Sequence, residues 1–321
     1  MYRQSMGKEG LLLVVIASIA MAAVAFFIDC PMRAPIDTGI CCASPSVWGL
    51  TPFWGWVLNL VLLLICTGGI AWLNKEYRII NNSDSVVTGM FMLTAASNIW
   101  VSGMLTSTLF VLIANVLCLG ILFGCYRQRN ATREIFVIGT VLAICSMFEY
   151  AVAFFIAAYI IGAVIMQCLS LRSLVAFFMG LAAPYWIALG FGWVRPEDFH
   201  VPVCAHIFIG LGDKTELLVG MINVGLTATL ALLLALSNSV RLYAGNSRRR
   251  LINMTIMMLG AVCLICMIFD FGNITAYLAT LYAVTAFQLA NCLELSKIRS
   301  GDLWLFVLAL LYIASFVLMV I

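Results

Sequence analysis

The sequence predicts an all-α protein built as a polytopic bundle of about eleven transmembrane helices. Hydrophobic residues make up 64% of the 321 residues and charged residues only 10%, whereas soluble domains carry roughly 25% charged residues. The mean hydropathy is +1.11. Crossing a bilayer core about 30 Å thick takes roughly 20 apolar helical residues, and an open strand would leave its backbone groups unpaired in lipid. The spans are therefore predicted to be helices.

The chain is expected to form a single integral membrane domain over residues 1–321, with no soluble module. Its first apolar run, 10–28, is longer than the roughly 7–15 residues of a signal-peptide core, so we expect a retained helix. The predicted spans are 10–28, 52–73, 87–103, 105–125, 134–148, 150–169, 173–194, 215–237, 251–270, 274–294 and 303–321.

Two continuous apolar runs, 87–125 and 134–169, are each divided into two spans. As single helices they would be roughly 55 Å long, nearly twice the bilayer core, at about 1.5 Å per residue. Ser102 and Gly103 offer a break in the first run, and Glu149 lies in the middle of the second. A re-entrant element remains the alternative for each run.

Basic residues predict the orientation of the bundle. With the N-terminus on the inner side, 14 of the 17 lysines and arginines fall on that side, and only Arg33, Arg195 and Lys214 fall outside. Because inner loops of membrane proteins carry the excess of basic residues, we predict the N-terminus inside and the C-terminus outside. The basic residues are dispersed among loops and the net charge is +3, so no nucleic-acid partner is expected.

The first predicted outer loop carries the acids Asp29 and Asp37. Two carboxylates in a short loop at the membrane surface are suited to act as a general base and as a ligand of a divalent cation, or they are simply solvated loop acids. Trp48 and Trp54 stand nearby and are candidates to stack on a sugar. Their alternative role is an aromatic belt at the interface.

Glu149 is the third candidate catalytic acid. It lies where the fifth and sixth predicted spans meet, without a neighbouring lysine or arginine in the sequence. An acid near a membrane end is costly unless it reaches water or finds a partner, which gives it functional weight. The alternative is a turn acid in the headgroup layer. Asp270 is predicted to lie in a tight outer turn before Gly272 and Asn273.

The second large outer loop supplies further candidate substrate-binding residues, Arg195, Asp198, His200 and His206. His200, Cys204 and His206 are spaced as possible metal ligands, but no second cluster of zinc spacing accompanies them, so neither a metal site nor a cofactor is predicted.

Four of the twelve cysteines are predicted to face outward, where one or two disulfides can form. These are Cys30, Cys41, Cys42 and Cys204.

No Walker loop, dinucleotide fingerprint, nucleophile elbow or zinc-protease motif is visible, which argues against ATP-driven pumps and the commonest membrane proteases. Three hypotheses remain. The leading one is transfer of a glycan from a polyprenyl-phosphate-linked sugar at the outer face, as in multi-pass glycosyltransferases. The first alternative is a transporter or lipid flippase that uses Glu149 and Asp270 as intramembrane charges. The second is a non-catalytic membrane subunit with protein partners in the cell envelope. Whether the chain is an enzyme is left open.

Four segments stand out by their asparagine, arginine, glycine and proline residues: Asn74 to Asn82, Leu105 to Asn115, Tyr126 to Arg133, and Leu171-Arg172-Ser173 through Gly180 to Pro184. Together they resemble an uncharacterised family of multi-pass inner-membrane proteins of Bacteroidota, about 300 residues long. The resemblance covers most of residues 50–195 and implies an inner-membrane location with a periplasmic outer face, but no activity.

Overall fold

The computed structural model describes residues 8–27, 37–80, 84–128, 130–199, 214–241, 247–296 and 301–320. Within these ranges the protein is all-α, with twelve α-helices, short 3-10 turns and no strand. The helices are α1 (Lys8–Phe27), α2 (Pro52–Tyr77), α3 (Asp84–Ala96), α4 (Ile99–Ser102), α5 (Thr108–Gly124), α6 (Thr132–Phe148), α7 (Phe155–Ile165), α8 (Leu171–Gly190), α9 (Lys214–Arg241), α10 (Ser247–Phe269), α11 (Ile274–Ser296) and α12 (Gly301–Val320). The 3-10 turns are η1 (Pro45–Val47), η2 (Tyr150–Phe154), η3 (Pro196–Asp198) and η5 (Phe271–Asn273).

Six helices in the described ranges are long and apolar enough to cross a membrane, which confirms the prediction of a multi-pass helical membrane protein. Shorter apolar helices stand between them. The six long segments are Pro52–Tyr77, Leu171–Gly190, Gly220–Ser239, Ser247–Phe269, Phe271–Glu294 and Leu303–Val320. The shorter ones are Leu11–Phe27, Ser85–Ala96, Thr108–Gly124 and Tyr150–Ile165.

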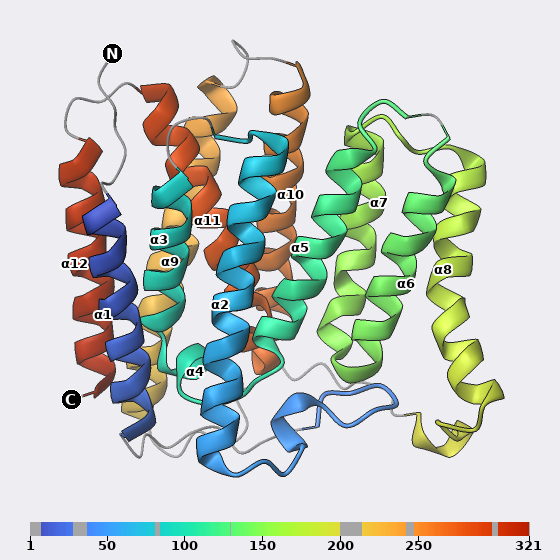
Figure 1. Ribbon diagram of the computed structural model, residues 1–321, viewed down its shortest axis with the longest axis horizontal. Coiled ribbons are helices and arrows are strands. Elements are labelled where there is room, and N and C mark those ends of the chain that lie inside the picture. Colours follow the sequence, from blue (N-terminus) through green and yellow to red (C-terminus); the bar gives the residue numbers. More distant parts are fainter. Residues whose placement is uncertain are drawn as a thin grey trace.

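The helices run alternately between two ends of the bundle (Figure 1). We call the end where α2 finishes and α8 begins the upper end, and the opposite end, where α2 begins and α8 finishes, the lower end. The described chain starts with α1 running from the upper towards the lower end, and α12 finishes at the lower end (Figure 1).

The first long apolar run is broken, as expected, but at two places. The predicted span 87–103 is wrong as one helix, because α3 ends at Ala96 and the four-residue α4 follows. Asn98 causes the first break: its backbone is extended, and its side-chain oxygen accepts a hydrogen bond from the amide of Trp100 at 2.9 Å, capping α4. Ser102 ends α4, and α5 begins at Thr108.

The second long run divides at Glu149, as the sequence predicted. Glu149 has an extended backbone, with φ −150° and ψ 108°, and it caps η2 through a hydrogen bond from the amide of Ala151. The predicted span 150–169 is too long, because α7 ends at Ile165 and Gln167 takes the left-handed conformation with φ 58°. A left-handed residue ends a helix.

The central helix is α11, which is almost wholly buried, whereas α8 and α12 are largely exposed. Polar side chains tie α11 to its neighbours. Asn98 Nδ2 donates to the hydroxyl of Tyr282 at 3.0 Å, and that hydroxyl donates to Asn223 Oδ1 at 2.7 Å. Asn223 Nδ2 in turn donates to Ser315 Oγ at 2.9 Å. Such interhelical hydrogen bonds hold membrane helices together where lipid supplies no hydrophobic driving force.

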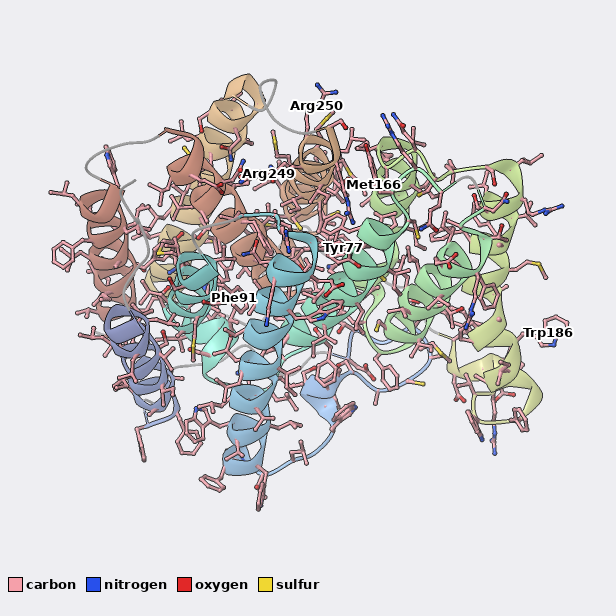
Figure 2. The ribbon with its side chains drawn as sticks, turned by 45° about the horizontal axis from the view of Figure 1, so that its top comes forward. Tyr77, Phe91, Met166, Trp186, Arg249 and Arg250 are labelled. Carbon is pink, nitrogen blue, oxygen red and sulfur yellow. The ribbon has the colours of Figure 1, made fainter. Side chains whose placement is uncertain are left out.

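The pair α6 and α8 lies at one edge of the bundle (Figure 1). The two helices cross at two glycines, where a Cβ on Gly139 would stand 2.4 Å from the carbonyl oxygen of Phe177 and a Cβ on Gly180 would stand 2.2 Å from that of Phe136. Only glycine permits this approach of two backbones, the usual role of small residues at membrane-helix interfaces. Trp186 projects from the far side of α8, away from the bundle (Figure 2).

Candidate functional site

Two buried acids lie together at the lower end of the bundle. Glu149 stands between α6 and η2, and Asp270 stands between α10 and η5. Each side chain is only 1% exposed. Neither acid forms an ion pair with a described residue, and the ion pair that the described residues do contain, between Arg249 and Glu294, belongs to the upper ends of α10 and α11.

Glu149 is held by neutral donors from four separate segments. Its Oε1 accepts from Asn273 Nδ2 at 2.8 Å and from the amide of Ala151 at 3.3 Å. Its Oε2 accepts from the hydroxyl of Thr38, and the hydroxyl of Ser107 also donates to the carboxylate. The carboxylate therefore has hydrogen bonds but no compensating charge among these partners.

Asp270 is held by two tyrosines. The hydroxyl of Tyr150 lies 2.9 Å from Oδ1 and 2.8 Å from Oδ2, and the hydroxyl of Tyr277 donates to Oδ2 at 2.9 Å. Tyr150 follows Glu149 directly in the chain, and Asn273, which binds Glu149, lies in the turn that follows Asp270. The segment of each acid thus supplies a donor to the other, and we call these residues the acid cluster: Thr38, Ser107, Glu149, Tyr150, Asp270, Asn273 and Tyr277.

Burial raises the pKa of Glu149 above its ordinary value, although the hydrogen bonds from Ser107, Thr38, Asn273 and Ala151 act in the opposite direction. Desolvation disfavours the charged form of a carboxyl, whereas donors that bind the carboxylate favour it. The net direction is upward, so Glu149 retains its proton to a higher pH than an exposed glutamate does.

The loop between α1 and α2 covers the acid cluster. The amides of Ile40, Cys41 and Cys42 all donate to the carbonyl oxygen of Met147, at 3.1, 3.3 and 3.1 Å, and the amide of Tyr150 donates to the carbonyl of Thr38 at 3.0 Å. Main-chain bonds therefore fasten this loop to the junction of α6 and η2. We call residues 37–44 the cover segment.

Asp37, a predicted catalytic acid, shapes the cover segment. Its side chain is exposed, and Oδ1 accepts from the amides of Gly39 at 3.1 Å and Ser44 at 2.9 Å. Acceptance of amides two or more residues ahead is the ordinary role of aspartate in a turn. The Asp37 side chain thus fixes the loop that brings Thr38 onto Glu149. Asp29, the other predicted loop acid, lies outside the described residues.

The two tryptophans that were predicted to bind a sugar contact different residues. Trp48 packs edge-on against Phe110 and Phe148, with ring centroids 5.7 and 6.4 Å away, so it borders the residue before Glu149. Trp54 packs against Phe53 at the beginning of α2 and is largely exposed. No described contact joins it to the acid cluster.

Arg195 and Asp198 form the turn η3, where the amide of Arg195 donates to Asp198 Oδ2 at 2.8 Å. Burial raises the pKa of the Cys41 thiol to about 12, with smaller contributions from Cys42 and Asp198. The contribution of Asp198 indicates that η3 lies near the cover segment. His200 and His206 lie outside the described residues, as do Cys30 and Cys204. Cys41 and Cys42 form no disulfide with a described cysteine.

An apolar groove of about 500 Å³ opens between the lower halves of α6 and α8. It borders the close crossing at Phe136 and reaches the cover segment at Cys42. Its walls are Phe136, Thr140, Ile144, Met147, Phe148, Ala183, Pro184, Ile187, Ala188, Trp193 and Val194. Met147 and Phe148 join this groove to the acid cluster, because they directly precede Glu149.

The sequence predicted Glu149 as a site residue. It placed Asp270 in an outer turn and paired it with Glu149 only in the transporter hypothesis, and it did not identify Tyr150, Tyr277 and Asn273 as hydrogen-bond partners of the two acids. The signal that could have found them is the spacing of Asp270, Asn273 and Tyr277, which lie within two helical turns of one another in a largely apolar region. In the ranges that the structure describes, no three His, Cys, Asp or Glu side chains come together as metal ligands.

Comparisons with models of protein families, with curated proteins and with solved structures gave no match. The chemistry of the site is therefore argued from this chain alone.

Proposed function

We propose that this protein is a membrane transporter in which the Glu149–Asp270 cluster takes up and releases a proton. The observation that carries the proposal is that two carboxylates, each 1% exposed, share one cluster whose described donors are all neutral. Ionisable groups buried in membrane bundles without a partner charge commonly belong to proton or ion pathways.

The raised pKa of Glu149 supports the proton as the species exchanged. A carboxyl that is protonated at one stage of a cycle and ionised at another needs a pKa close to the working pH, and burial moves it in that direction. Tyr150 and Asn273 connect the two acids, so a change of charge on one alters the hydrogen bonds of the other.

The proposed topology has eleven spans, with the N-terminus inside and the C-terminus outside. The alternating direction of the helices supports it, with α4 too short to count as a span (Figure 1). The acid cluster then lies at the outer end. We keep the proposed location in the inner membrane and membership of the Bacteroidota family, both supported by the sequence resemblance in residues 50–195.

The experiment is a proton-flux assay in proteoliposomes that hold a pH-sensitive dye. Vesicles are challenged with gradients of amino acids, organic acids, sugars and monovalent cations. We expect a gradient of one solute class to drive proton flux through the protein. Glu149→Gln should lower the rate of that flux at least tenfold. Glu76→Gln is the matched control, because Glu76 is exposed at the upper end of α2. Equal rates in wild type and Glu149→Gln, or no solute-dependent flux in correctly inserted wild type, would overturn the proposal.

Glycan transfer from a polyprenyl-phosphate-linked sugar is the second candidate, and the groove between α6 and α8 is the observation that favours it. An apolar groove that ends beside Glu149 and the cover segment suits the chain of a membrane lipid whose headgroup lies at the outer face. Asp37 and Trp48 border the same region. Asp37 Oδ1, however, already accepts hydrogen bonds from the amides of Gly39 and Ser44.

Mass spectrometry of lipid that co-purifies with the protein tests this second candidate. Ala183→Phe fills the groove and is expected to remove the bound lipid. Ala182→Phe is the control, because Ala182 is exposed on α8 and does not line the groove. Retention of an isoprenoid lipid in Ala183→Phe, or its absence from wild type, would leave transport as the better account.

A further inference from the structure

Four amide side chains are buried near the upper end of the bundle, on three adjacent helices. Asn238 comes from α9, Asn253 from α10, and Gln288 and Asn291 from α11. All four are at most 5% exposed. We call them the amide cluster.

One polar atom of each member lacks a hydrogen-bond partner among the described residues. These atoms are Asn238 Oδ1, Gln288 Oε1, Asn291 Oδ1 and Asn253 Nδ2. Deeper in the bundle the situation differs, since Asn115 Nδ2 donates to Thr280 and its Oδ1 accepts from Tyr159. A buried polar group without a partner costs free energy, so such a group calls for an explanation.

Contacts join α9, α10 and α11 around Gln288, and the contact from α10 is made by Gly260, two turns along that helix from Asn253. Asn238 Nδ2 donates to the main-chain oxygen of Gln288 at 2.9 Å, which sets α9 against α11. A Cβ on Gly260 would stand 3.8 Å from Gln288 Nε2, which sets α10 against the same residue. On α11, Gln288 and Asn291 are three residues apart and share a face.

An ion pair lies above the amide cluster. Arg249 donates to Glu294 Oε1 at 3.2 Å, and Glu294 is one turn beyond Asn291. Arg249 points towards α11, whereas Arg250 points away from the bundle (Figure 2). Arg249 and Glu294 neutralise each other, and no described carboxylate belongs to the cluster itself.

We infer that the amide cluster binds a monovalent cation of the Na⁺ class through the oxygens of Asn238, Gln288 and Asn291. The ligand must satisfy three oxygen acceptors, whereas a single water donates only two hydrogen bonds. Neutral oxygens are hard ligands, and Mg²⁺ and Ca²⁺ sites use carboxylates. Zinc prefers nitrogen and sulfur ligands. This inference does not depend on the proposed proton transport at the lower end.

The test is thermal unfolding of the purified full chain in detergent, in NaCl, KCl and choline chloride at equal ionic strength. We expect Na⁺ at several times its Kd to raise the Tm by roughly 2–4 °C over choline. Asn291→Leu and Gln288→Met should each abolish the shift. Asn291→Asp should lower the Na⁺ concentration needed for half of the shift at least tenfold, because it adds a negative charge beside the ion.

Asn59→Leu is the matched control. Asn59 is buried on α2, also has an unpartnered Oδ1, and its Nδ2 donates to Val101 and Ser102. Asn59→Leu should lower the Tm and keep the increase in Tm that Na⁺ causes. Glu149→Gln should keep that increase as well, because Glu149 lies at the other end of the bundle. The Na⁺ test therefore does not depend on whether the transport proposal is correct. Equal Tm values in Na⁺ and choline, or an undiminished shift in both Asn291→Leu and Gln288→Met, would overturn the inference and leave internal water as the occupant.

Discussion

The hydroxyl of Tyr150 lies within 2.9 Å of both carboxylate oxygens of Asp270, 120 residues further along the chain. This bond joins the break between α6 and α7 to the break between α10 and α11. Two interruptions of apolar runs, unrelated in sequence, therefore form one polar site.

Stability should depend on pH through Glu149. Because burial raises the pKa of Glu149 above 4.5, the folded state holds the proton more tightly than the unfolded state. This contribution is present in full below pH 4.5 and is lost as pH rises through the raised pKa. We expect the Tm of wild type to fall over that interval and Glu149→Gln to remove this part of the dependence. Thermal unfolding across pH measures it, with Glu76→Gln as control. An unchanged pH profile in Glu149→Gln would contradict the assignment.

Removing a donor to Asp270 should destabilise the protein. Tyr277→Phe leaves Tyr150 as the remaining tyrosine donor to Asp270 and is expected to cost about 1–3 kcal/mol, the usual cost of a lost bond to a buried polar group. Tyr126→Phe is the control, since the Tyr126 hydroxyl makes a 3.2 Å contact with Ser247 in an exposed setting. Denaturant or thermal unfolding measures the difference. A cost for Tyr277→Phe no greater than for Tyr126→Phe would speak against the cluster.

The crossing of α6 and α8 should not tolerate a side chain. Gly180→Ala places a Cβ against the backbone of Phe136, so the helices must separate, at a cost of about 1–3 kcal/mol. Gly68→Ala is the matched control, because a Cβ at that position on α2 meets no atom within 4 Å. Thermal unfolding of both variants measures the difference in Tm. An equal decrease in Tm for Gly180→Ala and Gly68→Ala would contradict the close approach of the two backbones.

The thiol of Cys41 should react slowly. Its pKa of about 12 leaves little thiolate at neutral pH, and the thiolate is the reactive form. We expect maleimide labelling of Cys41 to accelerate on unfolding. Labelling of unfolded protein with and without reductant also tests the prediction that some of Cys30, Cys41, Cys42 and Cys204 are oxidised. Labelling of all four without reductant would refute that prediction.

A reporter fused after Ile321 tests the odd number of spans. Periplasmic activity is expected, with a fusion in the predicted inner loop after Arg241 as the cytoplasmic control. Cytoplasmic activity after Ile321 would contradict the proposed topology.

The helices could be predicted well because apolar length and turn residues decide them locally. Glu149 as a helix break and the break after Ser102 followed from the sequence, since a run twice the bilayer thickness has to fold back. The additional end of α3 at Ala96 did not, because the Asn98 side chain must reach the amide of Trp100, and sequence alone does not show that geometry.

The site was predicted only in part because its contacts are distant in sequence. Glu149 meets Thr38 across 111 residues and Asn273 across 124. The two tyrosine donors of Asp270 could not be predicted, because Tyr150 and Tyr277 meet it only once η2 and α11 have packed. Trp54 was grouped with Glu149 by predicted depth alone, which carries no information on direction around the bundle.

In the proposed transporter, the cover segment would also set the rate of proton exchange at Glu149. Its three amides share the carbonyl oxygen of Met147, so moving the segment away from Met147 breaks the bonds of Ile40, Cys41 and Cys42 together. In the proposed transporter, a proton that approaches Glu149 from the lower end would have to wait for this segment to open. The frequency of that opening, rather than the affinity of the carboxylate, would limit exchange, and the amides of these three residues should exchange with deuterium at one common rate.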